Sequence, residues 1–338
     1  MKKTLFCSFL LGFTFLSSGC LSENRVEFIK TDDQIDVMVN NQLITSYLIG
    51  QQLSKPILYP LTSPSGEVVT RWYPLKEVEG ESNDHAHHTG VFFTYGSNGE
   101  VNGNSFWYNP HDSPPFNMDA KLPRISHVEI LEIAEGRGNG KLVTLNHWID
   151  KYNKPILEEN RVMEFFVRED EYIIDFTIRL TPVDTTVTFK DTKEGLFAIR
   201  VADWLAENAR GTLYESKGEY FNSHGEMRER NIWGKRSSWM RLEGEKEGKT
   251  IGVVIFNHPR SINYPTFWHA RGYGCFSANP LGQYDFMRDT RQDNPQHLTL
   301  TLSPGESALF KFRMIVYEGM RDKNQLDYEF EVFSSTLP

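Results

Sequence analysis

Polar and apolar residues alternate along most of the chain in short runs, a pattern typical of half-buried β-strands. Residues 34–39 alternate, Asn40-Asn41 reads as a turn, and residues 42–48 alternate again, so this stretch predicts a β-hairpin. Residues 124–189 repeat the pattern in five longer runs separated by turn sequences. We therefore expect a long antiparallel meander in the middle of the chain.

Helical patterns are few, and their scarcity indicates the fold class. Residues 280–287 fit one or two helical turns, and residues 324–333 fit a short C-terminal helix. Strands that do not alternate with helices form antiparallel sheets. We expect an all-β fold in which residues 26–338 form a single large antiparallel sandwich of two sheets, larger than an immunoglobulin-like domain. Two smaller β domains are the alternative.

The N-terminus reads as a secretory leader rather than as part of the fold. Lys2-Lys3 precedes an apolar run over residues 5–16, which is too short to span a bilayer. The next residues, Ser-Ser-Gly-Cys, resemble the bacterial lipoprotein box. This resemblance implies a signal peptide over residues 1–19, lipidation of Cys20 and a tether over residues 20–25. The protein would then sit in a bacterial cell envelope, held to the membrane by lipid alone. An ordinary signal peptide is the alternative.

Charge and cysteine content narrow the function classes. The formal net charge is −9, which disfavours nucleic acid and anionic lipid as partners. Cys7 would leave with the leader and Cys20 would carry lipid, so Cys275 has no disulfide partner and reads as a small buried residue. The chain has no P-loop, no Gly-x-Ser-x-Gly and no Gly-x-Gly-x-x-Gly between a strand and a helix, so nucleotide binding and serine-hydrolase chemistry have no support.

Residues 83–90, Asn-Asp-His-Ala-His-His-Thr-Gly, hold three of the ten histidines of the chain. If this stretch is a strand, His85 and His87 share one face and His88 takes the other. Such imidazoles bind a metal, hold an anion or transfer a proton. The alternative is a loop of solvated histidines. An irregular segment over residues 96–123 follows, and long loops in compact domains are often functional.

Two later stretches have compositions that fit the same kind of site. Residues 193–200 place Glu194 and Arg200 on one strand face, where two charges need solvent or a partner; a surface ion pair is the alternative. Residues 257–274 combine histidine, arginine, tryptophan and tyrosine among glycines and prolines. That composition is typical of sugar and carboxylate sites, and it also suits a protein interface. A basic turn over residues 233–236 is a fourth, weaker candidate.

These motifs, in this order, resemble the PmoA-like family of bacterial secreted proteins and lipoproteins. The matching residues are His85-x-His87-His88-x-Gly90, Asn102-Gly103, Phe106-Trp107, Lys193-Glu194-Gly195, Arg200, Trp233 to Arg236, His258-Pro259 and Pro265 to Gly274. Thr89 departs from the arginine expected after the histidine pair. The resemblance covers nearly all of the chain after the leader, and it also suggests the galactose mutarotase-like supersandwich, in which histidine and glutamate side chains on a concave sheet act as acid and base.

We expect an enzyme that acts on a carbohydrate or modified sugar by His/Glu acid–base chemistry, as an epimerase, lyase or hydrolase. The candidate catalytic residues are His85, His87, His88, Glu194, His258 and His269. The candidate substrate-binding residues are Asn102, Trp107, Arg200, Lys235, Trp268, Arg271 and Tyr273.

Two alternatives stay open at this point. One is a glycan-binding lipoprotein without catalysis. The other is a metal-dependent oxidoreductase, as the family label implies. The sequence requires no cofactor, but His85 and His87 with His258 or His269 would supply three ligands to a divalent metal.

Overall fold

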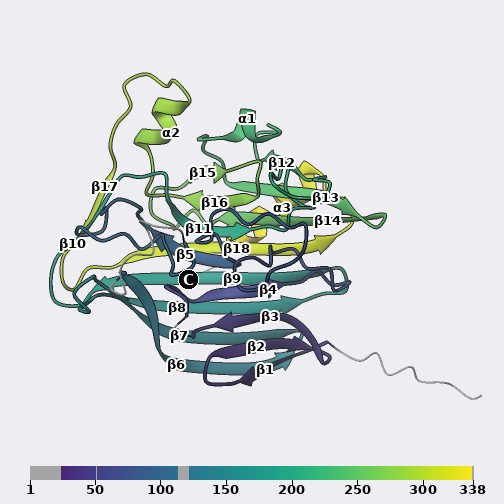
Figure 1. Cartoon of the computed structure of the whole chain (residues 1–338), viewed down its shortest axis with the longest axis horizontal. Helices are drawn as coiled ribbons and strands as arrows, with labels where there is room; N and C mark the ends of the chain where they lie inside the picture. Colours follow the sequence, from purple (N-terminus) through teal and green to yellow (C-terminus); the bar gives the residue numbers. More distant parts are fainter. Residues whose placement is uncertain (1–23, 51, 113–121, 337–338) are drawn as a thin grey trace, which may run out of the picture.

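The computed structural model describes residues 24–50, 52–112 and 122–336. Strands make up 47% of the described residues and helices 7%. One antiparallel sheet of 16 strands accounts for nearly all of the strand content and folds over into two layers (Figure 1). The predicted all-β, two-layer antiparallel sandwich is therefore confirmed.

The first layer is built on the predicted meander. Its strands, in spatial order, are β12 (Glu219–Asn222), β13 (Trp239–Lys246), β14 (Lys249–Asn257), β18 (Ala308–Glu318), β9 (Glu171–Pro182), β8 (Pro155–Val167), β7 (Asn139–Ile149) and β6 (Arg124–Arg137). The meander β6–β9 pairs each strand with its neighbour in sequence, as predicted for the first four of its five runs. The fifth predicted strand, over residues 185–189, is wrong as part of the meander, because β10 (Val187–Lys190) pairs in a separate sheet.

The second layer carries the hairpin and the motif-bearing strands. Its strands, in spatial order, are β1 (Arg25–Lys30), β2 (Gln34–Val39), β3 (Gln42–Leu48), β4 (Ile57–Leu61), β5 (Val91–Tyr95), β11 (Gly195–Arg200), β16 (Cys275–Asn279) and β15 (Phe267–Ala270). The predicted hairpin is β2–β3, with Val39 paired to Gln42 across its turn. The layers join where β1 pairs with β6, through two residue pairs.

The core lies between the two layers and is rich in aromatic rings. Phe197 of β11 stacks on Phe312 of β18 at 4.6 Å between ring centroids and also contacts Phe176 of β9 at 4.8 Å. Phe93 of β5 contacts Phe310 of β18 at 5.6 Å. Because side chains alternate along a strand, the residues next to Phe93 and Phe197 point to the outer face of the second layer.

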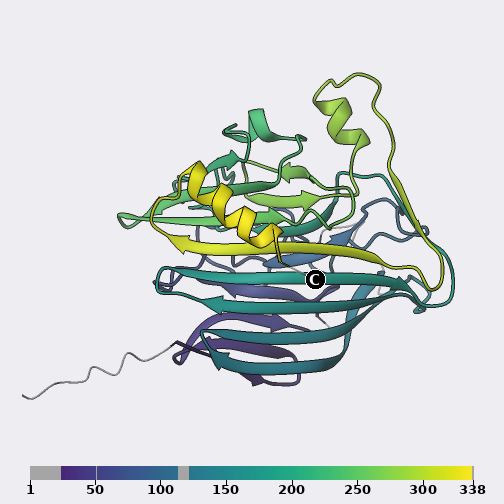
Figure 2. The ribbon, with the colours of Figure 1, turned by 180° about the vertical axis from the view of Figure 1, so that it is seen from behind.

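Elements outside the large sheet are small. A two-stranded sheet pairs β10 (Val187–Lys190) with β17 (Thr299–Leu302). The short helices are α1 (Glu229–Ile232) and α2 (Tyr284–Asp289), and the second of these lies in the predicted region. The predicted C-terminal helix is α3 (Lys323–Ser334), which begins with a capping box at Asp322. It covers the outer face of the first layer, where Leu326 and Phe333 are buried (Figure 2).

Candidate functional site

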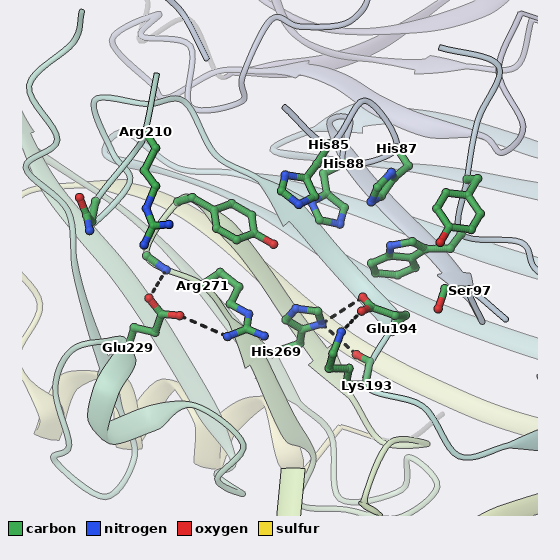
Figure 3. Close-up of a pocket in the computed structure, with 15 residues that line it drawn as sticks. His85, His87, His88, Ser97, Lys193, Glu194, Arg210, Glu229, His269 and Arg271 are labelled. Carbon is green, nitrogen blue, oxygen red and sulfur yellow. Dashed lines mark hydrogen bonds and ion pairs between the residues drawn. The ribbon is translucent and has the colours of Figure 1, made fainter. Parts of the chain in front are cut away.

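A pocket of about 470 Å³ lies on the outer face of the second layer, beside β5, β11 and β15. It brings together three segments that are far apart in the sequence. Its lining residues are His85, His87, His88, Ser97, Trp107, Tyr108, Lys193, Glu194, Asn208, Arg210, Glu229, His269, Arg271, Gly272 and Tyr273 (Figure 3). Eight of the thirteen residues predicted for the site therefore line one pocket.

The histidine-rich stretch is a loop, not a strand, because β5 begins only at Val91. The prediction that His85 and His87 face one way and His88 the other is wrong. All three line the pocket, and the rings of His87 and His88 lie 4.3 Å apart. Gly90 makes the join to β5 possible, since its φ is +61° and a Cβ there would lie 2.4 Å from the carbonyl oxygen of Leu58.

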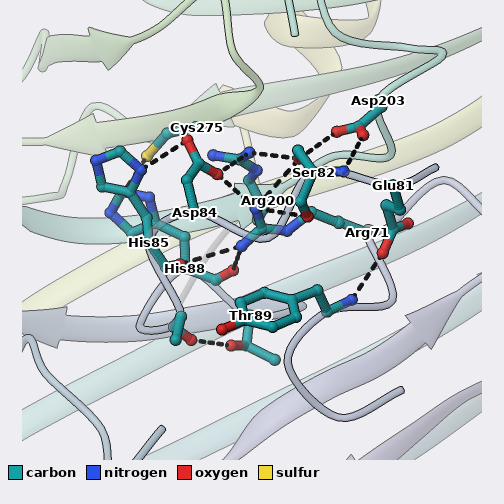
Figure 4. Close-up of polar contacts among 12 residues, drawn as sticks. Arg71, Glu81, Ser82, Asp84, His85, His88, Thr89, Arg200, Asp203 and Cys275 are labelled. Carbon is teal, nitrogen blue, oxygen red and sulfur yellow. Dashed lines mark hydrogen bonds and ion pairs between the residues drawn. The ribbon is translucent and has the colours of Figure 1, made fainter. Parts of the chain in front are cut away.

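Asp84 fixes the start of this loop by bridging two buried guanidinium groups (Figure 4). Its Oδ1 accepts hydrogen bonds from Arg71 Nη1 at 2.7 Å and from Arg200 Nη2 at 2.8 Å. Its Oδ2 lies 2.9 Å from Nδ1 of His85. Arg200, which was predicted to contact substrate, is fully buried and does not line the pocket. It instead lies beneath Tyr273, 4.8 Å from the ring centroid.

His87 is oriented by a buried carboxylate. Its Nδ1 lies 2.7 Å from Oδ1 of Asp112, and its backbone N–H donates to the same oxygen at 3.2 Å. A carboxylate only accepts, so Nδ1 carries a proton and Nε2 of the neutral ring has the free lone pair. Burial lowers the pKa of His87 below its usual value even though Asp112 opposes that shift. His87 is therefore a neutral acceptor at neutral pH.

His269 has the same arrangement on the other side of the pocket. Its Nδ1 donates to the backbone carbonyl of Lys193 at 2.8 Å, which again leaves Nε2 as the acceptor. Burial lowers the pKa of His269 to about 4, although Glu194 lies only 3.7 Å away. Glu194 itself pairs with Lys193. Burial opposes ionisation of Glu194, but His269 and Lys193 outweigh it and hold the pKa of Glu194 below its usual value.

His88 and Cys275 meet beneath the pocket. The Cys275 Sγ lies 4.0 Å from Nε2 of His88, and both side chains are buried. Burial lowers the pKa of His88 well below its usual value and raises that of the Cys275 thiol to about 12. The thiol stays protonated, which confirms that Cys275 is a buried residue without nucleophilic character.

Aromatic rings form much of the remaining wall. Trp107 lies between the two oriented histidines, with its ring 6.0 Å from that of His87 and 6.4 Å from that of His269. Its plane is tilted by only 11° from the plane of His269. The rings of His85, His88 and Tyr273 lie parallel to one another, with His85 and Tyr273 5.0 Å apart. The pocket thus pairs flat apolar surfaces with polar edges.

Four further predicted site residues lie elsewhere. His258 packs on Phe333 of α3, because β14 carries it away from the pocket. Trp268 points into the core between the layers, since it precedes His269 on β15 and adjacent residues face opposite ways. Lys235 pairs with Glu226 in a separate hollow. Asn102 holds its loop to β10 by hydrogen bonds to the backbone of residues 186 and 188.

Several residues of the site were not predicted. Asn208 and Arg210 line the pocket as isolated loop residues, and Glu229 begins a four-residue helix. Asp112 does not line the pocket but orients His87 from a loop. Only the length of the loop over residues 96–123 pointed toward Asp112.

In the described part of the chain, no three His, Cys, Asp or Glu side chains are arranged so that they could hold a metal ion. The set proposed from the sequence with His258 does not assemble, since that residue lies beside α3. Within the same residues, no helix has the length and apolar character needed to cross a membrane. Cys20 lies outside the described residues.

Comparison with known proteins identifies a family by sequence. The model of a family described as one of unknown function, DUF6807, matches residues 34–331, and this match does not carry the PmoA label suggested by the motifs. No curated protein matches the chain.

Solved structures give only distant likenesses. The GH36 α-galactosidase AgaB of Geobacillus stearothermophilus is 10% identical, with a TM-score of 0.42, over 87% of this chain and 41% of that one. The α-galactosidase of Lactobacillus brevis is 9% identical, with a TM-score of 0.38, over 89% and 40%. A galactose mutarotase related enzyme of Lactobacillus acidophilus is 8% identical, with a TM-score of 0.31, over 86% and 97%. The chain thus spans about two fifths of the length of the galactosidases. Likenesses this weak establish no shared activity.

Proposed function

We propose, for a chain that belongs to the DUF6807 family of unknown function, that the pocket is an active site for histidine-mediated acid–base catalysis on a carbohydrate. The proposal rests on the chemistry of the pocket alone. The reaction classes that fit are epimerisation, elimination and hydrolysis, because each requires a proton to be removed at one atom and delivered at another.

One observation carries the proposal: two imidazoles in one pocket have their Nδ1 atoms committed to fixed acceptors. His87 is held by Asp112 and His269 by the carbonyl of Lys193, so each presents Nε2 as an acceptor. Orientation by a third group is the usual way in which proteins set the tautomer and direction of a catalytic imidazole.

The protonation states allow these two residues to divide the work. Both have lowered pKa values, so either is a neutral base at neutral pH. When one Nε2 takes a proton from the substrate, the resulting imidazolium is stabilised by its carboxylate neighbour, Asp112 or Glu194. In elimination or hydrolysis the imidazolium then returns the proton to the leaving oxygen, whereas in epimerisation the other histidine, protonated from solvent, delivers a proton to the opposite face of the reacting carbon.

The aromatic wall favours a sugar as the substrate. Tyr108 and Tyr273 line the pocket with partly exposed rings that offer apolar surfaces to the C–H face of a sugar ring, whereas Trp107 is only 2% exposed and lies buried between the two histidines. Tyr108, Ser97 and Asn208 add hydroxyl and amide groups at the rim of the pocket. Apolar faces bordered by hydrogen-bonding groups suit a ring with an apolar face and a polar edge.

Proton NMR in D2O tests this function and separates the reaction classes. The protein is incubated with free hexoses, disaccharides and uronic acids. Epimerisation replaces a carbon-bound proton by deuterium, elimination removes such a proton and creates a vinyl signal, and hydrolysis creates new anomeric signals. We expect one of these changes for at least one sugar.

Variants connect turnover to the pocket. His87→Ala and His269→Ala should each lower turnover at least 100-fold, in line with the usual contribution of a general acid or base. His147→Ala is the matched control, because His147 lies on β7, outside the pocket, and should keep full activity. Full activity in either pocket variant would remove that residue from the mechanism. Sugar binding without turnover would indicate a glycan-binding protein instead.

We also propose that the protein is held at the cell envelope by a lipid on Cys20, on the basis of the leader and the sequence before this cysteine. Expression in a bacterial host should give a membrane fraction whose N-terminal peptide carries the mass of attached lipid. Cys20→Ala should release the protein from that fraction. Unchanged membrane association of this variant would contradict lipid anchoring.

A further inference from the structure

We propose that the substrate carries an anionic group, a carboxylate or a sulfate ester, and that Arg210 and Arg271 bind it. This inference rests on the proposed function, because it names the class of sugar that the same pocket takes. It follows from the charges of the lining, the pairing of those charges and their placement relative to the histidines.

The lining carries more positive than negative charge. Its cations are Lys193, Arg210 and Arg271, and its anions are Glu194 and Glu229, so the balance apart from the histidines is three minus two, or +1. The whole chain has a net charge of −9. A hollow whose charge is opposite in sign to the rest of the molecule concentrates ligands of the other sign, and here it favours anions.

The pairing of these charges leaves one cation available. Lys193 pairs with Glu194, and Arg271 Nη1 lies 3.5 Å from Oε1 of Glu229. Among the residues that the structure describes, Arg210 has no acidic group within ion-pair distance. An exposed arginine at the rim of a pocket, without a carboxylate partner, can use both of its terminal N–H pairs on a ligand.

Contacts with neighbouring residues hold Arg271 in a position to bind the same anionic group. Its guanidinium lies over the ring of Trp233, 3.4 Å from the centroid. Oε2 of Glu229 accepts the backbone N–H of Gly272 at 2.9 Å, which fixes the turn that carries Arg271. The contact with Glu229 is long, so guanidinium N–H groups remain for a second acceptor. A planar, pre-oriented arginine suits the two oxygens of a carboxylate or sulfate.

The two arginines lie at one end of the pocket and reach toward His269. In Figure 3, Arg210 lies above Glu229, Arg271 lies between Glu229 and His269, and His87 lies on the opposite side of the pocket. An anionic group held by the arginines would therefore direct the sugar ring toward the imidazoles. Fixing one end of a substrate in this way converts binding energy into orientation at the reacting atom.

Isothermal titration calorimetry with matched sugars tests the inference. The probes are D-galactose, D-galacturonate and D-galactose 6-sulfate, and the corresponding glucose series. We expect at least one anionic sugar to bind 10-fold or more tightly than its neutral counterpart, with a preference that falls as salt rises from 50 to 500 mM. A preference for galacturonate would indicate a carboxylate substrate, and a preference for the 6-sulfate would indicate a sulfated one.

Arg210→Gln should abolish that preference. Arg291→Gln is the matched control, because this exposed arginine does not line the pocket, and it should keep the preference. Neutral sugars that bind as tightly as anionic ones would overturn the inference and leave the proposed function standing. An anion preference that survives Arg210→Gln and Arg271→Gln would also overturn it. If anionic sugars bind through these arginines but no sugar is turned over, the inference stands and the proposed catalysis fails.

Discussion

His269 shows how far a single residue could be predicted from the sequence. The composition around it indicated a site, but it could not say whether Trp268 or His269 faces that site, because adjacent residues on a strand point in opposite directions. The core between the layers takes Trp268, and the pocket takes His269. The same composition misled the prediction for His258, since only the path of β14 places it beside α3. Residue type indicates which chemistry is available, whereas the backbone decides where it is used.

Burial of neutral His269 makes stability depend on pH. Its pKa is about 4 in the folded protein, against 6.5 for a free side chain. At pH values between 4 and 6.5, His269 is protonated in the unfolded chain but neutral in the folded protein. Stability therefore falls as the pH falls from 6.5 toward 4. We expect the protonation of this residue in the unfolded chain to lower the free energy of unfolding by about 2 kcal/mol when the pH falls from 7 to 5.

Urea unfolding at both pH values measures this cost in the native protein and in His269→Asn. The asparagine amide can still donate to the carbonyl of Lys193 but does not titrate. The variant should lose less stability on acidification than the native protein. An equal loss in both proteins would contradict the assignment of a neutral, buried His269.

Asp112 should control the protonation of His87. Its carboxylate raises the pKa of His87 against the effect of burial. Asp112→Asn removes that charge, so the pKa of His87 should fall further. NMR titration of the histidine ring C–H signals measures the pKa of His87 directly and needs no substrate. The ring signals of His147 serve as an internal control. A pKa of His87 that rises or stays constant in the variant would show that Asp112 does not act on this ring.

At the level of elements, most of the residues that line the pocket lie in loops rather than in strands. The histidine loop, the segment after β5, the segment before β11 and the α1 region each contribute side chains to it. The strands were predictable because alternation has a fixed period. The loops were not, because their paths depend on single contacts such as Asp84 with Arg71 and Arg200. That explains why the histidines were recognised while Arg210 and Glu229 were missed.

Gly90 should be essential to the histidine loop. Gly90→Ala combines a left-handed backbone with a Cβ 2.4 Å from the Leu58 carbonyl oxygen, so we expect a loss of about 3 kcal/mol. Gly103→Ala is the control, because its φ is +78° and a Cβ there meets no atom within 4 Å. It should lose only about 1 kcal/mol, the cost of the backbone conformation. Chemical denaturation measures both, and equal losses would show that the contact with Leu58 has no effect.

The fold of the whole molecule was easier to predict than the site. Two layers were expected because the strands are too numerous for an ordinary sandwich. It was not expected that both layers belong to one continuous 16-stranded sheet, because nothing in the sequences of β1 and β6 indicates that they pair. Pairing between strands so distant in sequence is settled by tertiary packing.

Phe197 should contribute strongly to the stability of the two-layer core. It contacts Phe176 and Phe312 of the opposite layer and is almost completely buried. Phe197→Ala leaves a cavity at that junction, and we expect a loss of about 3–5 kcal/mol in urea unfolding. Phe197→Leu should lose clearly less, because it keeps most of the volume. Similar losses for the two variants would mean that the stacked rings, not the filled volume, stabilise the core.

The sheet ends at β12 and at β15, each only four residues long. Terminal strands with unpaired backbone groups are where separate protein molecules join into larger aggregates. Four residues offer too few such groups to recruit a second chain efficiently. So large a sheet would otherwise be prone to aggregation, and its short ends should keep the protein dispersed at high concentration.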